Sequence, residues 1–463
     1  MNESQLKIGR CAGCCITHLI GVLVLSGCAT YSDSFGVVER NLATGNYEAA
    51  LSVVEKQSDS RTGHVLFLLN KGMILRMKRD FAASNESFEA AKIEMERLYA
   101  ASISENALSF VVNDATVSYV GDAHEQVLVH LYMALNYLEL GQINEARVEA
   151  LQVDIKLREI GEKVPDSKYT EDAMSRYLSG LIYEELEEWD DAMIAYRKSY
   201  EAYKSYQADF GLEMPDMLKH DLVRVAQRLG LTGEADQYSK EFGIDAEVNE
   251  PVPDRQGELI FVLNNGLAPI KRERAVSTSG PPPSVAVEAA THKQARIAQP
   301  VIVNIAIPYY ESRSGKALNA RVSAVGKQST TQIMEDIDAI ARASLDARMP
   351  AITARSVARA IAKGAIQESV DRAGSRDSDP AIELLGSFFI RVASIVTERA
   401  DTRSWLTLPA NLQLARLALP PGSYVVTVEL LGEEKRVIST REYQNVVIKE
   451  RRKTYLTEHW ISN

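Results

Sequence analysis

The stretch from Tyr177 to Tyr200 reads YLSGLIYEELEEWDDAMIAYRKSY and decides the fold of the first half of the chain. Small and aromatic residues recur in it at intervals of 3, 6, 3 and 4, which suits two helices joined by a short turn. The small residues let the two helices approach closely, and the aromatic residues fill the space on either side. The residues with this spacing are Gly180, Tyr183, Trp189, Ala192 and Tyr196.

The same spacing recurs elsewhere in the first half. The matching residues are Gly72, Leu75, Phe81, Ser84 and Phe88, then Ala134, Tyr137, Ile143, Ala146 and Ala150, with partial units at Gly45, Tyr47 and Ala50 and at Ala226, Gly230 and Ala235. This pattern resembles the tetratricopeptide (TPR) repeat. The resemblance implies an all-α, TPR-like solenoid over residues 36–246, with a concave groove. We expect its aromatic residues to form the core between helices.

Two segments of this half differ from the repeats. Residues 101–125 show no helical period, so we expect an irregular insertion in which Asn113, Asp114, Tyr119 and Gly121 form turns. The alternative is an insertion that lies over the groove or contacts the neighbouring domain. Acidic residues crowd one turn of the repeat at 184–191. We expect a solvated face there, and a surface for a basic partner is the alternative.

The second half, residues 254–463, combines strand and helix patterns and predicts an α+β domain with a sandwich-like antiparallel sheet. Its expected strands are residues 258–264, 301–307, 320–325, 419–430, 445–449 and 454–461. We expect a helical insertion at about 328–399, with helices over 328–372 that Pro350 interrupts and a further helix from Pro380 to about Arg399. Residues 268–300 include three consecutive prolines, which indicates a mobile loop. The strand that begins LPPGSYVV is similar to PEGA-type sandwich modules.

The amino-terminal segment indicates where the protein resides. Lys7 and Arg10 precede an apolar run that ends in Leu25-Ser26-Gly27-Cys28. This resembles the bacterial lipobox, which implies a cleaved signal peptide at 1–27, acylation of Cys28 and a lipidated tether at 28–35. Two or more acyl chains hold a protein stably at a bilayer. Ala29 after the cysteine implies the outer membrane, periplasmic face. A plain cleavable signal or a short membrane anchor are the alternatives.

Charge is distributed unevenly along the chain. Residues 29–250 carry 40 acidic and 22 basic residues, whereas residues 251–463 carry 22 acidic and 28 basic ones. This asymmetry indicates two regions that either pair with each other or face separate partners. Because the linker at 247–253 and the proline-rich loop separate them, we expect the two halves to fold independently. Without the signal peptide, Cys28 is the only cysteine, so no disulfide is expected.

Taken with the lipobox, three short motifs resemble an uncharacterised family of proteobacterial outer-membrane lipoproteins with TPR-like repeats. They are Asn113-Asp114 with Tyr119, the run Ala134-Leu135-Asn136-Tyr137, and the run from Ala400 to Trp405 with Leu408-Pro409. The resemblance implies a location and an architecture but no activity.

No motif of a catalytic, metal or cofactor site is found in the sequence, and basic residues form no patch typical of nucleic-acid binding. We therefore expect no enzyme activity, catalytic residue, metal or cofactor. The expected function is a lipid-anchored periplasmic scaffold or regulator of an envelope machine, in cell-wall synthesis or surface assembly, which binds periplasmic or outer-membrane proteins through the solenoid groove. The alternative is a binding component for an anionic glycan or lipid, recognised by a basic helical stripe of Arg355, Arg359 and Lys363.

Overall fold

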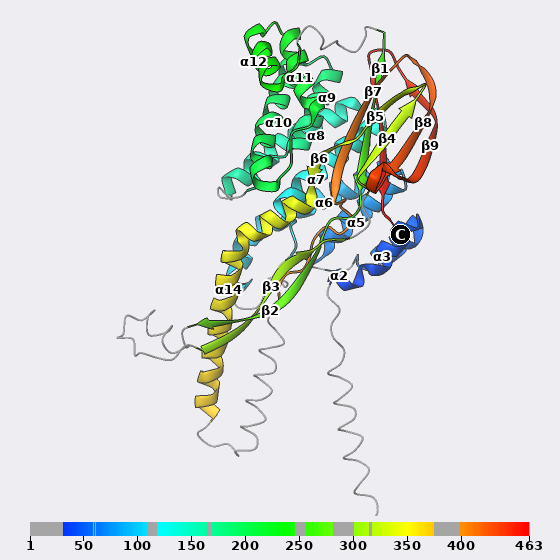
Figure 1. Cartoon of the computed structure of the whole chain (residues 1–463). Coiled ribbons are helices and arrows are strands. Elements are labelled where there is room, and N and C mark those ends of the chain that lie inside the picture. Colours follow the sequence, from blue (N-terminus) through cyan, green and yellow to red (C-terminus); the bar gives the residue numbers. More distant parts are fainter. Residues whose placement is uncertain are drawn as a thin grey trace, which may run out of the picture.

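The computed structural model describes residues 31–58, 60, 62–109, 118–163, 168–245, 255–280, 301–313, 317–374 and 399–462. The expected signal peptide, Cys28, Asn113-Asp114 and the expected helix from Pro380 lie outside these residues. The first half of the chain is helical, and the second half combines strands with one long helix (Figure 1). The mixed fold class predicted from the sequence is correct at this level.

The helical half is built from consecutive helix pairs. A short helix, α2 (Tyr31–Ser34), precedes them. The pairs are α3 (Gly36–Ala43) with α4 (Tyr47–Glu55), α5 (His64–Met77) with α6 (Phe81–Ser109), α7 (Ala123–Glu139) with α8 (Ile143–Lys163), α9 (Ala173–Glu185) with α10 (Trp189–Phe210), and α11 (Asp216–Arg228) with α12 (Thr232–Phe242). We call α3, α5, α7, α9 and α11 the first helices and their partners the second helices.

Close contacts between paired helices occur at the predicted small residues. Gly180 lies against the ring of Tyr196, and a Cβ at Gly72 would lie 2.6 Å from the ring of Phe88. Between the helices of each pair, the residue two positions before the second helix has a positive φ. This residue is glycine in three pairs, but it is Arg79 in one and Glu187 in another. The predicted positions of the small residues and turns are therefore confirmed.

The segment between the second and third pairs differs from its prediction. Helix α6 continues to Ser109, so residues 101–109 are helical rather than irregular. Tyr119 is buried, and its hydroxyl donates a hydrogen bond to the carboxylate of Glu125. Tyr119 therefore packs in the core in addition to lying in the turn before α7.

Two four-stranded sheets form the body of the second half. The inner sheet has the order β10-β1-β7-β6 and the outer sheet the order β5-β4-β8-β9. Their strands are β1 (Gly257–Asn265), β4 (Asn319–Ala324), β5 (Lys327–Thr330), β6 (Gln332–Asp336), β7 (Asn411–Leu419), β8 (Gly422–Leu431), β9 (Val437–Ile448) and β10 (Lys453–Trp460). Strand β7 was missed by the sequence analysis. Because β1 pairs with β10 in parallel, the expectation of a purely antiparallel sheet is wrong.

The inner sheet is covered on both faces, as the burial of all nine residues of β1 indicates. Side chains alternate between the two faces of a strand. Leu259, Phe261 and Leu263 therefore join the core between the two sheets, whereas Ile260 and Val262 join the core of the helix pairs. The layers are thus helices, inner sheet and outer sheet, and one continuous core joins the helices to the inner sheet.

A separate arm extends away from these layers (Figure 1). It consists of β2 (Ile270–Gly280), which pairs with β3 (Val301–Glu311), and of α14 (Ile337–Gly374) packed against β3. Two expectations are wrong here. Residues 270–280 form a strand instead of a mobile loop, and α14 continues through Pro350 without a break. The helical insertion also begins later than 328, because residues 327–336 form β5 and β6.

Candidate functional site

The inner face of the helical half is filled by the inner sheet of the same chain. Hydrogen bonds to the second half come from each first helix between α5 and α11. Asn70 accepts from Thr407, Tyr132 donates to Asn264, and Asp221 accepts from Arg416. All eleven residues of α9 from Ala173 to Tyr183 are buried, so the side of this helix that faces the inner sheet is covered. The expectation of a groove left open for a protein partner is therefore wrong.

The ion pairs across this interface join the acidic first half of the chain to the basic second half. Glu184 pairs with Lys453 at 3.1 Å, Glu185 with Arg452 at 3.7 Å, and Asp122 with Lys271 at 3.1 Å. Further pairs are Asp122 with Arg348, Glu39 with Arg313, Asp221 with Arg416, and Glu185 with Lys453. Within the described residues, every pair between the halves has its acid in the helical half. For Glu184 and Glu185, the basic partner considered for the acidic cluster is thus the second half itself. Glu187, Asp190 and Asp191 are exposed, as expected of a solvated face.

The run from Ala400 to Pro409 closes one end of this interface. Its Trp405 is 1% exposed and packs edge-on against Phe88 and Tyr132, with ring centroids 5.7 and 6.0 Å away. The Trp405 backbone N–H donates to Glu125, at 2.7 Å. Burial, helped by the charge of Asp122, raises the pKa of Glu125 to about 7 although Tyr119 also donates to it. Two of the sequence motifs, Tyr119 and the run before Trp405, therefore meet at one buried carboxyl group.

The outer side of the helix pairs presents a groove of about 380 Å³ between α8, α9 and α10. Four apolar side chains line it while remaining between 37% and 52% exposed: Val148, Leu151, Ile155 and Ile194. Asp154 lies in the groove and pairs with Arg176 and Lys198. Asp191 also lines it, and its neighbours Asp190 and Glu187 are exposed. We call this surface the outer groove.

A second cavity, of about 170 Å³, lies where the arm meets the helical half, and we call it the basic pocket. Arg355 and Arg359, two of the three predicted stripe residues, line it. Arg355 is exposed, whereas Arg359 is 2% exposed. The side chain of Lys363 lies outside the described residues. Three further residues of this cavity were not predicted from the sequence: Lys271, Arg348 and Asp122. Arg348 precedes Arg355 by seven residues, on the same helical face, and this spacing was the available signal.

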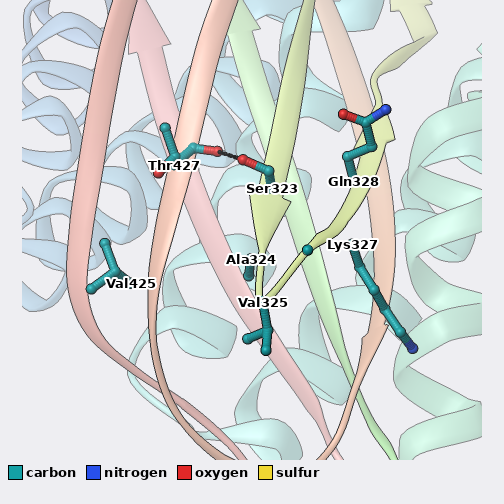
Figure 2. A pocket seen from close by; sticks show the side chains of 8 residues that line it. Ser323, Ala324, Val325, Lys327, Gln328, Val425 and Thr427 are labelled. Carbon is teal, nitrogen blue, oxygen red and sulfur yellow. Dashed lines mark hydrogen bonds between the residues drawn. The ribbon is translucent and has the colours of Figure 1, made fainter.

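A third hollow, of about 310 Å³, lies beside the β4–β5 turn (Figure 2). Ser323 donates to the backbone oxygen of Thr427 there. Among the described residues that line this hollow, Lys327 alone is charged, and its amine donates to the backbone oxygen of Ala418, at 2.7 Å. These described lining residues offer no set of converging groups for a ligand.

Within the described residues, no group of three or more His, Cys, Asp or Glu residues is placed to hold a metal ion. None of the helices described combines the length and apolar character needed to cross a membrane.

Comparison with known proteins gives weak likenesses. No family model matches the sequence, and no curated protein matches it. Among solved structures, the crystal structure of MamA protein overlaps with a TM-score of 0.29 and 15% identity, covering 45% of this chain and 87% of that one. MamA 41-end from Desulfovibrio magneticus RS-1 gives 0.29 and 13%, covering 48% and 99%. Because these TM-scores are well below 0.5, the helical repeat is assigned from its own helix pairs and contacts.

Proposed function

We propose that this chain is a lipid-anchored scaffold protein, with TPR-like helix pairs, that binds a protein partner through the outer groove. Cys28 would carry the lipid and hold the protein at the periplasmic face of the outer membrane. There it would serve or regulate an envelope machine for cell-wall synthesis or surface assembly. The partner site differs from the one expected from the sequence, because the inner face is already occupied.

The observation that carries this proposal is the exposure of apolar side chains in the outer groove. Val148, Leu151 and Ile155 lie at spacings of three and four residues along α8, so they form one stripe, and Ile194 of α10 faces it across the groove. Contiguous exposed apolar side chains with a charged rim are typical of interaction surfaces. A groove between helices suits an amphipathic helix with apolar residues at the same spacing.

The charges around the groove indicate what kind of helix it would receive. Asp154 is engaged by Arg176 and Lys198, whereas Asp191 lines the groove near the exposed Asp190 and Glu187. A partner helix with basic residues at one end would complement this acidic end of the groove. The proposed occupant is therefore a basic amphipathic helix of another envelope protein.

Site-specific photocrosslinking in cells tests the partner site. A crosslinking residue at Ile194 should capture one defined protein, and Leu151→Asp in the same chain should abolish the product. The matched control is a crosslinking residue at Val425, which is 46% exposed on the outer sheet. Products of equal yield from the Ile194 and Val425 positions, unaffected by Leu151→Asp, would contradict the proposal.

The lipid anchor has its own test. Cys28→Ser should release the protein from the membrane pellet and prevent labelling with a radioactive fatty acid. If the variant sediments with outer membranes as fully as the unmodified chain does, the lipid anchor is wrong. The crosslinking result stands apart from this outcome because it depends on the groove alone.

A further inference from the structure

The short helix α2, which follows Cys28 closely, is fixed to the base of the arm. The hydroxyl of Ser32 donates to the backbone oxygen of Lys271 in β2, at 3.0 Å, and Ser32 is buried. The hydroxyl of Tyr31 accepts a hydrogen bond from the side-chain amide of Asn70 in α5, at 2.8 Å. Contacts with β2 and with the first half thus hold α2 in place.

The chain between Cys28 and α2 is short compared with the arm. Cys28 and Tyr31 are three residues apart, so their Cα atoms are separated by at most about 11 Å. A lipid on Cys28 therefore brings the bilayer surface within about this distance of α2. Helix α14, in contrast, has 38 residues and spans about 57 Å. The arm extends from the same side of the layers on which α2 lies (Figure 1).

These two lengths restrict how the arm is oriented at a bilayer. If the arm pointed at the bilayer, its far end would have to enter the hydrocarbon. Charged side chains, which are costly in hydrocarbon, recur along the first half of α14 at Asp338, Arg342, Asp346 and Arg348. An arm that lies along the bilayer surface satisfies both the short connection and these charges.

The β2–β3 ribbon has one face toward α14 and one face away from it. Lys271 and Pro308 line the basic pocket together with residues of α14, so they lie on the first face. Because side chains alternate along a strand, Arg274 and Tyr309 lie on the other face. Arg274 is exposed, and Tyr309 is 36% exposed. The Arg274 guanidinium lies 5.8 Å from the centre of the Tyr309 ring. Tyrosine and arginine both suit the bilayer interface, since each combines an apolar part with a polar end.

We propose that the arm lies along the surface of a bilayer that contains anionic phospholipid, with Arg274 and Tyr309 against the headgroups. Strands β2 and β3 and helix α14 together carry nine basic and six acidic residues, whereas residues 29–250 have an excess of acidic ones. An anionic surface attracts basic segments and repels acidic ones. The charges therefore favour an orientation with the arm at the bilayer and the helix pairs away from it. This inference rests on the lipid anchor of the proposed function.

Fluorescence quenching on vesicles tests this orientation. The chain from Cys28 onward is coupled through its Cys28 thiol to a maleimide lipid, in vesicles of phosphatidylcholine and phosphatidylglycerol that include a lipid with a nitroxide headgroup. A fluorescent amino acid replaces either Glu311, which is exposed at the base of the arm, or Asp236, which is exposed on α12. The nitroxide should quench the emission from position 311 strongly and leave that from position 236 unchanged.

A substitution on the ribbon tests the contact with headgroups. Arg274→Gln, at an exposed position, should lower the ratio of docked to undocked arm about fivefold, and the quenching at position 311 with it. Vesicles of phosphatidylcholine alone should have the same effect on the unmodified chain. The matched control is Arg436→Gln, an exposed position of the β8–β9 turn, which should be quenched as the unmodified chain is. Near-ultraviolet circular dichroism verifies that both variants are folded.

Each outcome decides the proposal. Absence of quenching at position 311, or equal quenching at positions 311 and 236, would show that the arm does not lie on the bilayer. Quenching at position 311 that neither Arg274→Gln nor the omission of phosphatidylglycerol reduces would also overturn it, because no anionic headgroup is then recognised. Since the lipid is coupled chemically, these results do not depend on acylation in cells, which Cys28→Ser tests. They are also independent of the outer groove, which the Ile194 crosslink tests.

Discussion

The inner and outer faces of the helix pairs are made by the same repeat but have opposite surroundings. On the inner face, polar side chains such as Asn70, Tyr132 and Asp221 are buried and bonded to the second half of the chain. On the outer face, apolar side chains such as Leu151 and Ile194 are exposed. From residue type alone, the polar inner face would be taken as exposed and the apolar outer face as buried. The concave side of a helical repeat is thus a binding site only when its own chain leaves it empty.

The largest expected effect concerns the halves expressed apart. Residues 29–250 and 254–463 should each fail to fold cooperatively, because separation exposes the shared core around Ile260 and Val262. The measurement is thermal unfolding followed by circular dichroism. Two soluble fragments with sharp, independent unfolding transitions would show that the interface is dispensable. The inner face of the helix pairs would then be a possible site for a protein partner.

One substitution on each face tests whether side chains are buried on the inner face and exposed on the outer face. Trp405→Ala should lower the free energy of unfolding by about 3–5 kcal/mol, because it empties a buried site between Phe88 and Tyr132. Ile194→Ala on the outer face, where the side chain is 47% exposed, should cost no more than about 1 kcal/mol. Urea denaturation measures both values. Equal costs would mean that the outer face is buried against something in the folded protein.

The buried carboxyl group of the inner face should make stability depend on pH. The pKa of Glu125 is raised by burial to about 7, so the folded state retains this proton at a pH where the unfolded state has lost it. Its contribution is therefore complete below about pH 4.5 and is lost as the pH rises through 7, a change of about 3 kcal/mol. Glu125→Gln should flatten the slope, although Glu335 and Asp172, whose pKa burial also raises, keep their own share of it. Glu145→Gln, at an exposed position of α8, should leave the slope unchanged, and a slope as steep in Glu125→Gln as in the unmodified chain would assign it to other groups.

Contacts within a helix pair give the next effect. Gly180→Ala places a methyl group into the ring of Tyr196 and should destabilise the protein by about 1–3 kcal/mol. Gly161 of α8 has no neighbour within 4 Å of an added Cβ, so Gly161→Ala should stabilise by about 0.5–1 kcal/mol. Opposite signs in urea denaturation are the expected result. Two substitutions of the same sign would contradict the helix packing described.

The smallest effect lies in the turns. Glu187 has φ 61° at the position where three other pairs have glycine, a conformation that favours glycine. Glu187→Gly should therefore raise the free energy of unfolding by about 0.5–1 kcal/mol. Glu188→Gly, at φ −84°, should lower it. A loss of stability at both positions would show that the Glu187 side chain contributes more than its backbone costs.

Local patterns predicted the helix pairs well, because small residues, aromatic residues and turns follow one another within about 25 residues of sequence. Predictions failed where partners lie far apart. Strand β2 contains Lys271, Arg272 and Arg274 and was assigned to a loop, since its pairing with β3 lies beyond a proline-rich stretch. Strand β7 was missed although it lies in the middle of the inner sheet.

The residues of the candidate sites also divide into those that local spacing predicts and those brought together from distant parts of the chain. Arg355 and Arg359 were predicted to share a helical face, since they lie four residues apart, and they line one cavity. Lys271 and Asp122 reach that cavity from other elements, so no local spacing identifies them. The exposure of Leu151 and Ile194 depends on which helices cover α8 and α10, and this is a property of the whole stack.

The parallel pairing of β1 with β10 has a consequence for the order in which the protein folds. Asn264 of β1 donates to the backbone oxygen of Glu458, a residue 194 positions further along the chain. Contacts of such long range form slowly, because a large loop must close before they contribute. During synthesis the helix pairs emerge long before β10 does, so their inner face stays uncovered until the inner sheet has formed. In that interval a chaperone able to cover the unfilled face would prevent aggregation, and slowing the emergence of β10 should increase the yield of such complexes.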